Sequence, residues 1–384
     1  MNKKNSGYNT RRAIVLVSDA YGGRGGIALY NRNFLKALCS FPGMEEVVAV
    51  PRSVTYELEE MPVNLSYITT AVGSRLKYLM KCMQLALFEK RVDLIICGHL
   101  HLLPFAYLLK LCHRCQVVPI TYGVEAWTPT SHRVVNLICS RLDAFISIRK
   151  LTAHRLMQWS GIEDAKFYYL PNGIDDSKYG VAPKRQDLLM KFGLENKKVV
   201  MTAGRVDSTE FDRRKGFDEI LEVLPELRKQ VPDVVYLIVG DGDDKKRLAQ
   251  KAKGLGVDDI IRFSGYVRDS EKADFYRLAD VFAMPGSNPI FDRYPFRFVF
   301  LEALACGVPV VGCKLEDKSE VNDSDANALI IQVDPNDKKA IMSGILEGFT
   351  RSGEGAFPEM ESFYFPAFQD RLHGFLTQIV NQRK

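Results

Sequence analysis

The sequence lacks long hydrophobic runs. No stretch reaches the roughly 18 apolar residues that a membrane-spanning helix needs, so we expect no transmembrane segment. The apolar stretch 13–17 is also too short for the hydrophobic region of a secretory signal peptide, and polar and basic residues precede it. These absences predict a cytoplasmic protein, with contact at the inner face of the membrane left open.

The sequence also lacks a dense block of lysine and arginine. Its net charge of +5 comes from 52 basic and 47 acidic residues along the whole chain. We find no basic cluster with interleaved aromatic residues, which nucleic-acid binding would require. The small positive excess suits phosphate ligands or an anionic membrane surface, and no nucleic-acid partner is expected.

Paired cysteine motifs are scarce. Among eight cysteines, one CxxC pair occurs, Cys112 and Cys115, and no second pair stands at the spacing of a zinc site. Most of the cysteines lie inside apolar runs, which is typical of reduced residues packed in a core. We therefore predict no metal or redox centre.

The chain has 384 residues, and a single core rarely exceeds about 250–300 residues. Short apolar runs alternate with amphipathic helical patterns in both halves, which predicts two doubly wound parallel-sheet, Rossmann-like α/β domains facing a cleft. Ligands bind beyond the carboxyl ends of such strands. We set the domains at 1–178 and 179–364, with a helix at 365–384 packing back on the first. The expected strands are 13–17, 47–50, 94–97, 117–121, 144–148 and 168–170, then 199–203, 234–239, 260–263, 281–284 and 308–312.

A glycine-rich turn at 22–26 follows the first expected strand. Gly25 and Gly26 allow backbone amides to approach a phosphate or a sugar beside a helix start. The spacing Gly23, Gly25, Ala28 also fits a dinucleotide fingerprint, so an NAD(P)-dependent oxidoreductase is one alternative. That interpretation needs an acidic residue after the second strand, where Pro51 and Arg52 stand instead. A purely structural turn is the other alternative.

Charged residues stand at two further sites in the second half. Gly204 and Arg205 end an expected strand, and Lys215 precedes an expected helix, so two cations are placed to clamp a diphosphate. Two solvated surface charges are the alternative. Glu302 is a lone carboxylate in an apolar helix, where it needs a partner. A ribose diol or an arginine elsewhere would serve. Amides near Phe298 and Val299 begin that helix.

Taken together and in this order, the motifs resemble the retaining GT-B glycosyltransferases of family 4 over nearly the whole chain. The most specific pieces lie in the second half, and the supporting pieces lie in the first half and at the domain junction. They are 204–205 with 215–216, 239–242, 262–267, 279–281 and 300–311, and then 22–26, 122–127, Ser147 and 171–175.

The resemblance implies a role for each site residue. Arg205 and Lys215 hold the diphosphate of a UDP- or GDP-linked sugar, and Glu302 accepts hydrogen bonds from the ribose. These three are the predicted catalytic residues. The predicted donor-binding residues are Gly25, Gly26, Gly204, Phe298, Val299 and the backbone of Tyr266 and Val267 along the base. No metal and no further cofactor is implied, because the two cations and a helix dipole neutralise the leaving diphosphate.

The sequence departs from the family pattern at two positions. Tyr294 stands where relatives carry a glutamate that contacts the donor sugar, with Asp292 as the nearest acid. Tyr122 stands where many relatives carry a histidine, and His99 and His101 occupy another loop. A catalytically weak or inactive nucleotide-binding relative is therefore a second alternative.

Two segments extend the hypothesis. The polar insert 206–214 separates Arg205 from Lys215, and Arg213 or Arg214 would replace Lys215 if the insert displaces it. The helix 76–88 has an apolar face flanked by Arg75, Lys77 and Lys81, which favours either core packing or contact with a membrane. We expect a hexosyltransferase that acts on a growing polysaccharide or on a lipid-linked acceptor.

Overall fold

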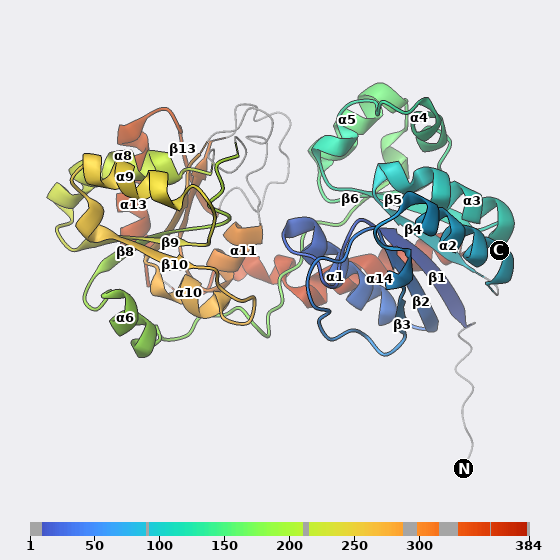
Figure 1. Ribbon diagram of the computed structural model, residues 1–384, viewed down its shortest axis with the longest axis horizontal. Helices are drawn as coiled ribbons and strands as arrows, with labels where there is room; N and C mark the ends of the chain where they lie inside the picture. Colours follow the sequence, from blue (N-terminus) through green and yellow to red (C-terminus); the bar gives the residue numbers. More distant parts are fainter. Residues whose placement is uncertain are drawn as a thin grey trace, which may run out of the picture. The chain divides into compact units, whose positions relative to one another are not determined.

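The computed structural model describes residues 10–89, 92–209, 215–286, 298–314, 329–353 and 355–381. Contacts divide the chain into two compact units, Met1–Gly173 with Phe365–Lys384, and Ile174–Tyr364 (Figure 1). The first unit thus ends with the turn 171–173, slightly before the predicted boundary after residue 178, and the C-terminal helix belongs to the first unit.

The first unit is built on a seven-stranded sheet in the order β3-β2-β1-β4-β5-β6-β7, and every strand pair in it is parallel. Most of its central strands are apolar runs buried on both faces, as parallel strands between two helical layers should be. The strands are β1 (Arg11–Val17), β2 (Met44–Pro51), β3 (Leu65–Tyr67), β4 (Leu94–Gly98), β5 (Gln116–Thr121), β6 (Phe145–Ser147) and β7 (Phe167–Tyr169).

Helices cover this sheet. Residues of α2 to α5 share one hydrophobic core with alternate strand residues. The helices α1 and α14 pack on each other (Figure 1). Tyr30 of α1 lies against Phe368 with ring centroids 5.6 Å apart, and Phe41, which follows α1, lies 5.3 Å from the His373 ring. The helices are α1 (Gly26–Cys39), α2 (Arg75–Phe88), α3 (Leu103–His113), α4 (Arg133–Cys139), α5 (Lys150–Ser160) and α14 (Phe365–Asn381).

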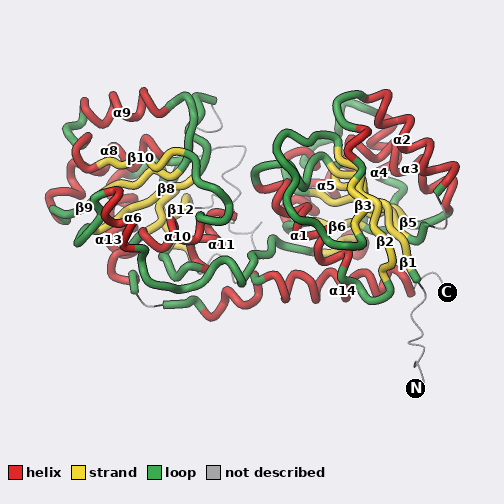
Figure 2. Tube along the Cα trace, turned by 60° about the horizontal axis from the view of Figure 1, so that its bottom comes forward, coloured by secondary structure: helices red, strands yellow, loops and turns green. Residues whose placement is uncertain are grey.

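The second unit repeats the plan with six parallel strands in the order β10-β9-β8-β11-β12-β13. Residues of α8, α9 and α13 share one hydrophobic core with the sheet, and those of α6, α10 and α11 share another. In Figure 2 helices lie on both sides of this sheet, with α9 on one side and α10 on the other. The elements are β8 (Lys198–Ala203), β9 (Val234–Val239), β10 (Ile261–Gly265), β11 (Val281–Met284), β12 (Val310–Cys313), β13 (Ile330–Val333), α6 (Gln186–Phe192), α8 (Phe217–Gln230), α9 (Lys245–Gly254), α10 (Lys272–Leu278), α11 (Phe298–Ala305) and α13 (Lys338–Arg351).

Each sheet therefore has a point where the strand order reverses, between β1 and β4 in the first unit and between β8 and β11 in the second. The predicted doubly wound class is confirmed for both units. Ligands of such sheets bind in the crevice beyond the carboxyl ends of the strands at this reversal. The residues after β1, β4, β8 and β11 are therefore the candidate ligand-binding residues of the two units.

Two further sequence predictions are addressed by the described residues. No helix among them is both long and apolar enough to cross a membrane. All eight cysteines are free thiols, and six are buried, in agreement with core packing. Burial raises the pKa of the Cys82 and Cys139 thiols to about 12 each, so these thiols stay protonated and unreactive.

Candidate functional site

Glycines bring the ends of β8 and β9 unusually close together. The Gly204 amide donates to the Val239 carbonyl at 2.9 Å, and the Gly240 amide donates to the Gly265 carbonyl at 3.1 Å. A Cβ atom placed on Gly240 would lie 1.9 Å from the Gly204 carbonyl oxygen, a distance no side chain permits. The carboxyl ends of β8 and β9 are thus packed backbone against backbone, which requires glycine at position 240.

The side chain of Lys215 meets the backbone of Arg205 at this edge. The Lys215 Nζ donates to the Arg205 carbonyl oxygen at 3.0 Å. The lysine stem lies against Gly204, where a Cβ atom would be 3.2 Å from Nζ. The Arg205 side chain is 70% exposed, with its Nε 3.8 Å from an Asp207 carboxylate oxygen. The insert 206–214 therefore does not carry Lys215 away from Arg205.

The helix α8 begins beside the same two residues. Gly216 precedes α8 with φ +100°, and a Cβ atom there would lie 2.6 Å from the Gly286 amide nitrogen. Since Gly286 follows β11, the start of α8 lies at the reversal of strand order between β8 and β11. A helix N-terminus carries partial positive charge. Together with Arg205 and Lys215 it makes an arrangement suited to a diphosphate.

Glu302 lies in the core rather than on an open surface. Its side chain belongs to α11 and is 2% exposed. One carboxylate oxygen accepts the Tyr179 hydroxyl at 2.8 Å, and the other accepts the Tyr276 hydroxyl at 2.6 Å. Sequence reasoning names a ribose or an arginine as its partner, and the structure shows two tyrosines. No described contact joins Glu302 to Arg205 or Lys215, so its ribose role stays a prediction.

The other predicted residues of the second unit lie at strand and helix ends. Tyr266 and Val267 directly follow β10, with Tyr266 half-exposed and Val267 buried. Gly265 before them has φ +72°, which turns the chain at the end of the strand. Phe298 and Val299 form the start of α11 and pack against the core on its side of the sheet.

In the first unit, the glycine turn follows β1 at the point where strand order reverses. Gly25 precedes α1 with φ +95°, and a Cβ atom there would meet open space. The turn is held by the segment after β2, because the Thr55 and Tyr56 amides donate to the Gly22 carbonyl at 2.9 and 3.0 Å. Gly26 is the first residue of α1, so its amide lies at a helix N-terminus.

Tyr122 is engaged inside the first unit. Its hydroxyl donates to the Asn31 side-chain oxygen at 2.5 Å, and its ring packs edge-on to Tyr30 with centroids 5.5 Å apart. The ring is 5% exposed, and burial raises the pKa of the phenol well above its ordinary value. Tyr122 is therefore a neutral phenol that is hydrogen-bonded within the first unit.

Three histidines gather beyond β4. The His99 and His101 rings stack with centroids 5.1 Å apart, and His132 lies 5.9 Å from His101. The His99 Nδ1 accepts the His101 amide at 3.2 Å, and burial lowers the pKa of His99. The sequence places His99 and His101 in this loop but does not point to His132, which stands 31 positions after His101 with no motif to link them.

Several predictions fall on residues that the structure does not describe. Tyr294, Asp292, Arg213 and Arg214 lie outside the described residues. Within the described part of the chain, no group of three or more His, Cys, Asp or Glu side chains is placed to hold a metal ion. Metal independence itself stays a prediction.

Comparison with solved structures identifies the fold. Over 96% of this chain and 100% of theirs, the protein superposes on Anabaena HepE in complex with UDP with a TM-score of 0.70 at 17% identity. It superposes on a sucrose-phosphate synthase from Thermosynechococcus elongatus with a TM-score of 0.72 at 18% identity, over 97% of this chain and 100% of that one. The two parallel-sheet units therefore have the fold of the GT-B glycosyltransferase structures.

Sequence comparison then gives the family. The Glycosyltransferase Family 4 model matches residues 24–178, and the Glycosyl transferases group 1 model matches residues 197–350. The chain belongs to glycosyltransferase family 4, of the group 1 glycosyl transferases. Because the chain belongs to this family, the alternative of an NAD(P)-dependent oxidoreductase, which was based on Gly23, Gly25 and Ala28, is rejected.

Two curated relatives cover most of the chain. A GDP-mannose-dependent alpha-(1-6)-phosphatidylinositol monomannoside mannosyltransferase of Mycolicibacterium smegmatis is 29% identical over 319 residues, which are 78% of this chain and 79% of the relative. A GDP-mannose-dependent monoacylated alpha-(1-6)-phosphatidylinositol monomannoside mannosyltransferase of Corynebacterium glutamicum is 25% identical over 79% of this chain and 80% of the relative.

Proposed function

We propose that this glycosyltransferase moves a hexose, with retention of its anomeric configuration, from a nucleotide-diphosphate sugar to a glycan or lipid-linked acceptor. The observation that carries the proposal is the meeting of Arg205, Lys215 and the start of α8 at the reversal of strand order in the second sheet. GDP-mannose is the first donor to test, because the relatives that cover most of the chain are named as GDP-mannose-dependent. UDP-linked sugars are the second.

The chemistry follows from charge. Breaking the bond between sugar and diphosphate leaves negative charge on the diphosphate, and pre-placed cations stabilise this charge as it develops. Arg205 offers a planar set of donors for phosphate oxygens, and Lys215 adds a compact positive charge. The N-terminal amides of α8 add partial positive charge without a metal ion. We therefore propose a metal-independent reaction.

The proposal is tested by measuring ligand binding and turnover directly. Melting curves are recorded with GDP, GDP-mannose, UDP and UDP-glucose, each with and without a metal chelator, because a ligand of the folded state raises Tm by mass action. Donor consumption is then followed with short mannosides and with phosphatidylinositol as acceptors. A raised Tm with one nucleotide series in the presence of chelator supports the proposal. Unchanged melting with all four ligands contradicts it.

Arg205→Ala is expected to weaken nucleotide-diphosphate binding by about tenfold. A hydrogen bond to a charged group contributes about 1.5–3 kcal/mol, and the lower end applies because the side chain is 70% exposed. Lys229→Ala is the matched control, since Lys229 belongs to the same unit and is also 70% exposed. Isothermal titration of both variants with GDP measures the effect. Equal affinities in the two variants would remove Arg205 from the site.

The second apolar face of α2 supports a membrane-bound acceptor. In the structure α2 has two apolar faces. Tyr78, Cys82 and Leu85 form one face, which is buried in the core, and four other apolar residues form an exposed stripe at spacings of four, three and four. Basic side chains flank the stripe, a combination that binds anionic bilayers. The exposed residues are Leu76, Met80, Met83 and Leu87, and the flanking ones are Arg75, Lys77 and Lys81.

Met80→Asp is expected to reduce binding to vesicles of phosphatidylglycerol and phosphatidylcholine by about tenfold. The change removes apolar contact of about 1–2 kcal/mol and adds a charge that the lipids repel. Met190→Asp in the other unit is the matched control, because Met80 and Met190 are both 61% exposed. Vesicle co-sedimentation at low and high salt measures binding. If both variants sediment like the wild type, α2 does not contact the membrane.

One observation favours a second candidate, a nucleotide-binding relative with weak or no transfer activity. The Tyr122 phenol is bonded to Asn31 inside the first unit, so it offers no ionisable imidazole at the place where relatives carry one. In its inactive form, this candidate predicts GDP or UDP binding without donor hydrolysis or transfer to any acceptor. Turnover with a single acceptor, at a rate that scales with enzyme concentration, rejects it.

A further inference from the structure

The loop that carries Arg205 lies along the loop that follows β9. The Val206 amide donates to the Asp241 carbonyl at 3.0 Å, and the Asp244 amide donates back to the Val206 carbonyl at 2.9 Å. A Cβ atom on Gly242 would lie 2.2 Å from the Val206 carbonyl oxygen, so the approach depends on glycine. The residue next to Arg205 is thereby fixed to the start of α9.

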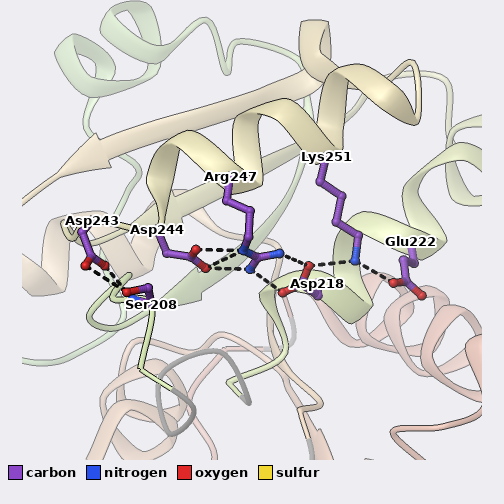
Figure 3. Close-up of polar contacts among 7 residues, drawn as sticks. All are labelled: Ser208, Asp218, Glu222, Asp243, Asp244, Arg247 and Lys251. Atoms are coloured by element: carbon purple, nitrogen blue, oxygen red, sulfur yellow. Dashed lines mark hydrogen bonds and ion pairs between the residues drawn. The ribbon is translucent and has the colours of Figure 1, made fainter.

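A side-chain contact closes the end of this loop. The Ser208 amide donates to one Asp243 carboxylate oxygen at 2.6 Å, and the Ser208 hydroxyl donates to the other at 2.9 Å (Figure 3). The backbone that follows Arg205 is therefore held at Val206 and Ser208 by the segment 241–244. The conformation of Arg205 thus depends on where that segment lies.

Arg247 joins that segment to the start of α8. Its guanidinium donates to Asp244 at 2.6–3.0 Å and, through two nitrogens, to both Asp218 oxygens at 2.8 and 2.7 Å (Figure 3). Asp218 lies in the first turn of α8, which begins directly after Lys215 and Gly216. One side chain from α9 thus links the loop of Arg205 to the helix start that follows Lys215.

The ion pairs that Arg247 makes with Asp244 and Asp218 are partly shielded from solvent. Asp244 is 5% exposed, and the Asp218 and Arg247 side chains are 21% and 35% exposed. Burial alone would raise the pKa of Asp218, but hydrogen bonds from Arg247 and Lys251 outweigh it and hold that pKa below its ordinary value. Lys251 also bonds Glu222 at 2.6 Å, which extends the network along α8 (Figure 3). Removing Arg247 leaves carboxylates in a sheltered place without their main partner.

We infer that Arg247 is a positioning residue of the nucleotide site, which sets Arg205 and Lys215 at the spacing that a diphosphate requires. The inference rests on the proposed function for its ligand. Arg247 does not itself reach the loop of Arg205 or Lys215; it acts through Asp244 and Asp218. Its planar fork of donors bonds both oxygens of Asp218 through two nitrogens while it also bonds Asp244, and the single nitrogen of a lysine cannot make this bidentate contact.

The experiment compares Arg247→Gln with two reference variants by titration with GDP. We expect GDP affinity to fall about tenfold in Arg247→Gln and nearly as far in Arg247→Lys, since a bidentate contact is lost in both. Arg228→Gln is the matched control. Arg228 lies at the opposite end of α8, and two of its guanidinium nitrogens donate to the two carboxylate oxygens of Asp259 at 2.8 and 2.6 Å. It should bind GDP like the wild type.

A double-mutant cycle separates positioning from general damage. If Arg247 acts through Arg205, the tenfold effect of Arg247→Gln falls below about twofold in an Arg205→Ala background, because coupled residues are not additive. An equal loss in both backgrounds, or wild-type affinity in Arg247→Gln, overturns the inference. Thermal melting accompanies each titration, so that an unfolded variant is recognised and replaced by Arg247→Lys.

Amide hydrogen exchange distinguishes failure of the inference from failure of the proposed function. Without any nucleotide, exchange at Val206 and Ser208 should be faster in Arg247→Gln than in the wild type and unchanged in Arg228→Gln. If exchange is faster in Arg247→Gln and the wild-type protein binds no nucleotide, the proposed function is rejected while Arg247 remains the residue that holds the loop. Unchanged exchange in Arg247→Gln overturns the inference whatever the protein binds.

Discussion

Gly240→Ala is expected to disrupt the carboxyl edge of the second sheet and to abolish measurable nucleotide binding. The new methyl group would lie 1.9 Å from the Gly204 carbonyl oxygen, and Gly240 has φ +142°, a conformation that L side chains rarely adopt. Backbone on both sides must move, and such overpacking costs about 3 kcal/mol or more. Because Gly204 precedes Arg205, the displacement reaches the residue that we propose holds the diphosphate.

Thermal melting and GDP titration measure the two effects. A loss of about 3 kcal/mol lowers Tm by roughly 6–12 °C in a unit of this size. Gly254→Ala is the control, since Gly254 ends α9 in the same unit and a Cβ atom there meets nothing within 4 Å. That variant should melt and bind like the wild type. If Gly240→Ala matches Gly254→Ala in both measurements, the close approach of β8 and β9 is not required.

The sequence predicts the fold because its central strands are apolar runs between amphipathic helices. The expected run 13–17 is the buried part of β1, and 281–284 and 234–239 coincide with β11 and β9. The edge strands β3 and β13 escape prediction. β3 lies at one edge of the first sheet and has three residues, none of them buried. β13 lies at one edge of the second sheet and has four residues. The sequence of β3 lacks a clear apolar run because the strand is short and not buried. β13 has an apolar run with Ile330, Ile331 and Val333 buried, but a run this short does not by itself distinguish a strand from a buried helical segment.

The candidate site is predictable where its residues stand next to strand ends in the sequence. Gly204 and Arg205 follow β8 directly, and Lys215 follows them in the sequence after the charged insert 206–214. Contacts made by distant residues are not predictable in this way. Tyr179 reaches Glu302 across 123 residues and Arg247 reaches Asp218 across 29, with no periodicity or motif to connect either pair. These partners are set by how α8, α9, α10 and α11 pack on the sheet.

Glu302→Ala is expected to lower the stability of the second unit by about 4 kcal/mol. The substitution leaves the Tyr179 and Tyr276 hydroxyls without an acceptor where these tyrosines are 8% and 2% exposed. Each unsatisfied buried group costs about 1–3 kcal/mol, and the lost side-chain volume adds to this. Urea unfolding monitored by fluorescence measures the change. Stability within about 0.5 kcal/mol of the wild type would contradict the described contacts.

Glu302→Gln separates the structural role of this carboxylate from its proposed role in holding a ribose. A carboxylate has about four lone-pair positions, and the two tyrosines use two of them, so acceptor capacity remains for a diol. The glutamine amide keeps the shape of the side chain but not its charge. We therefore expect GDP affinity to fall about tenfold while the free energy of unfolding falls by only about 1 kcal/mol. Tyr276→Phe is the control, because it removes one donor and keeps the charge; it should lower stability and leave GDP affinity unchanged. A large stability loss in Glu302→Gln with wild-type GDP affinity would make Glu302 a residue of the core alone.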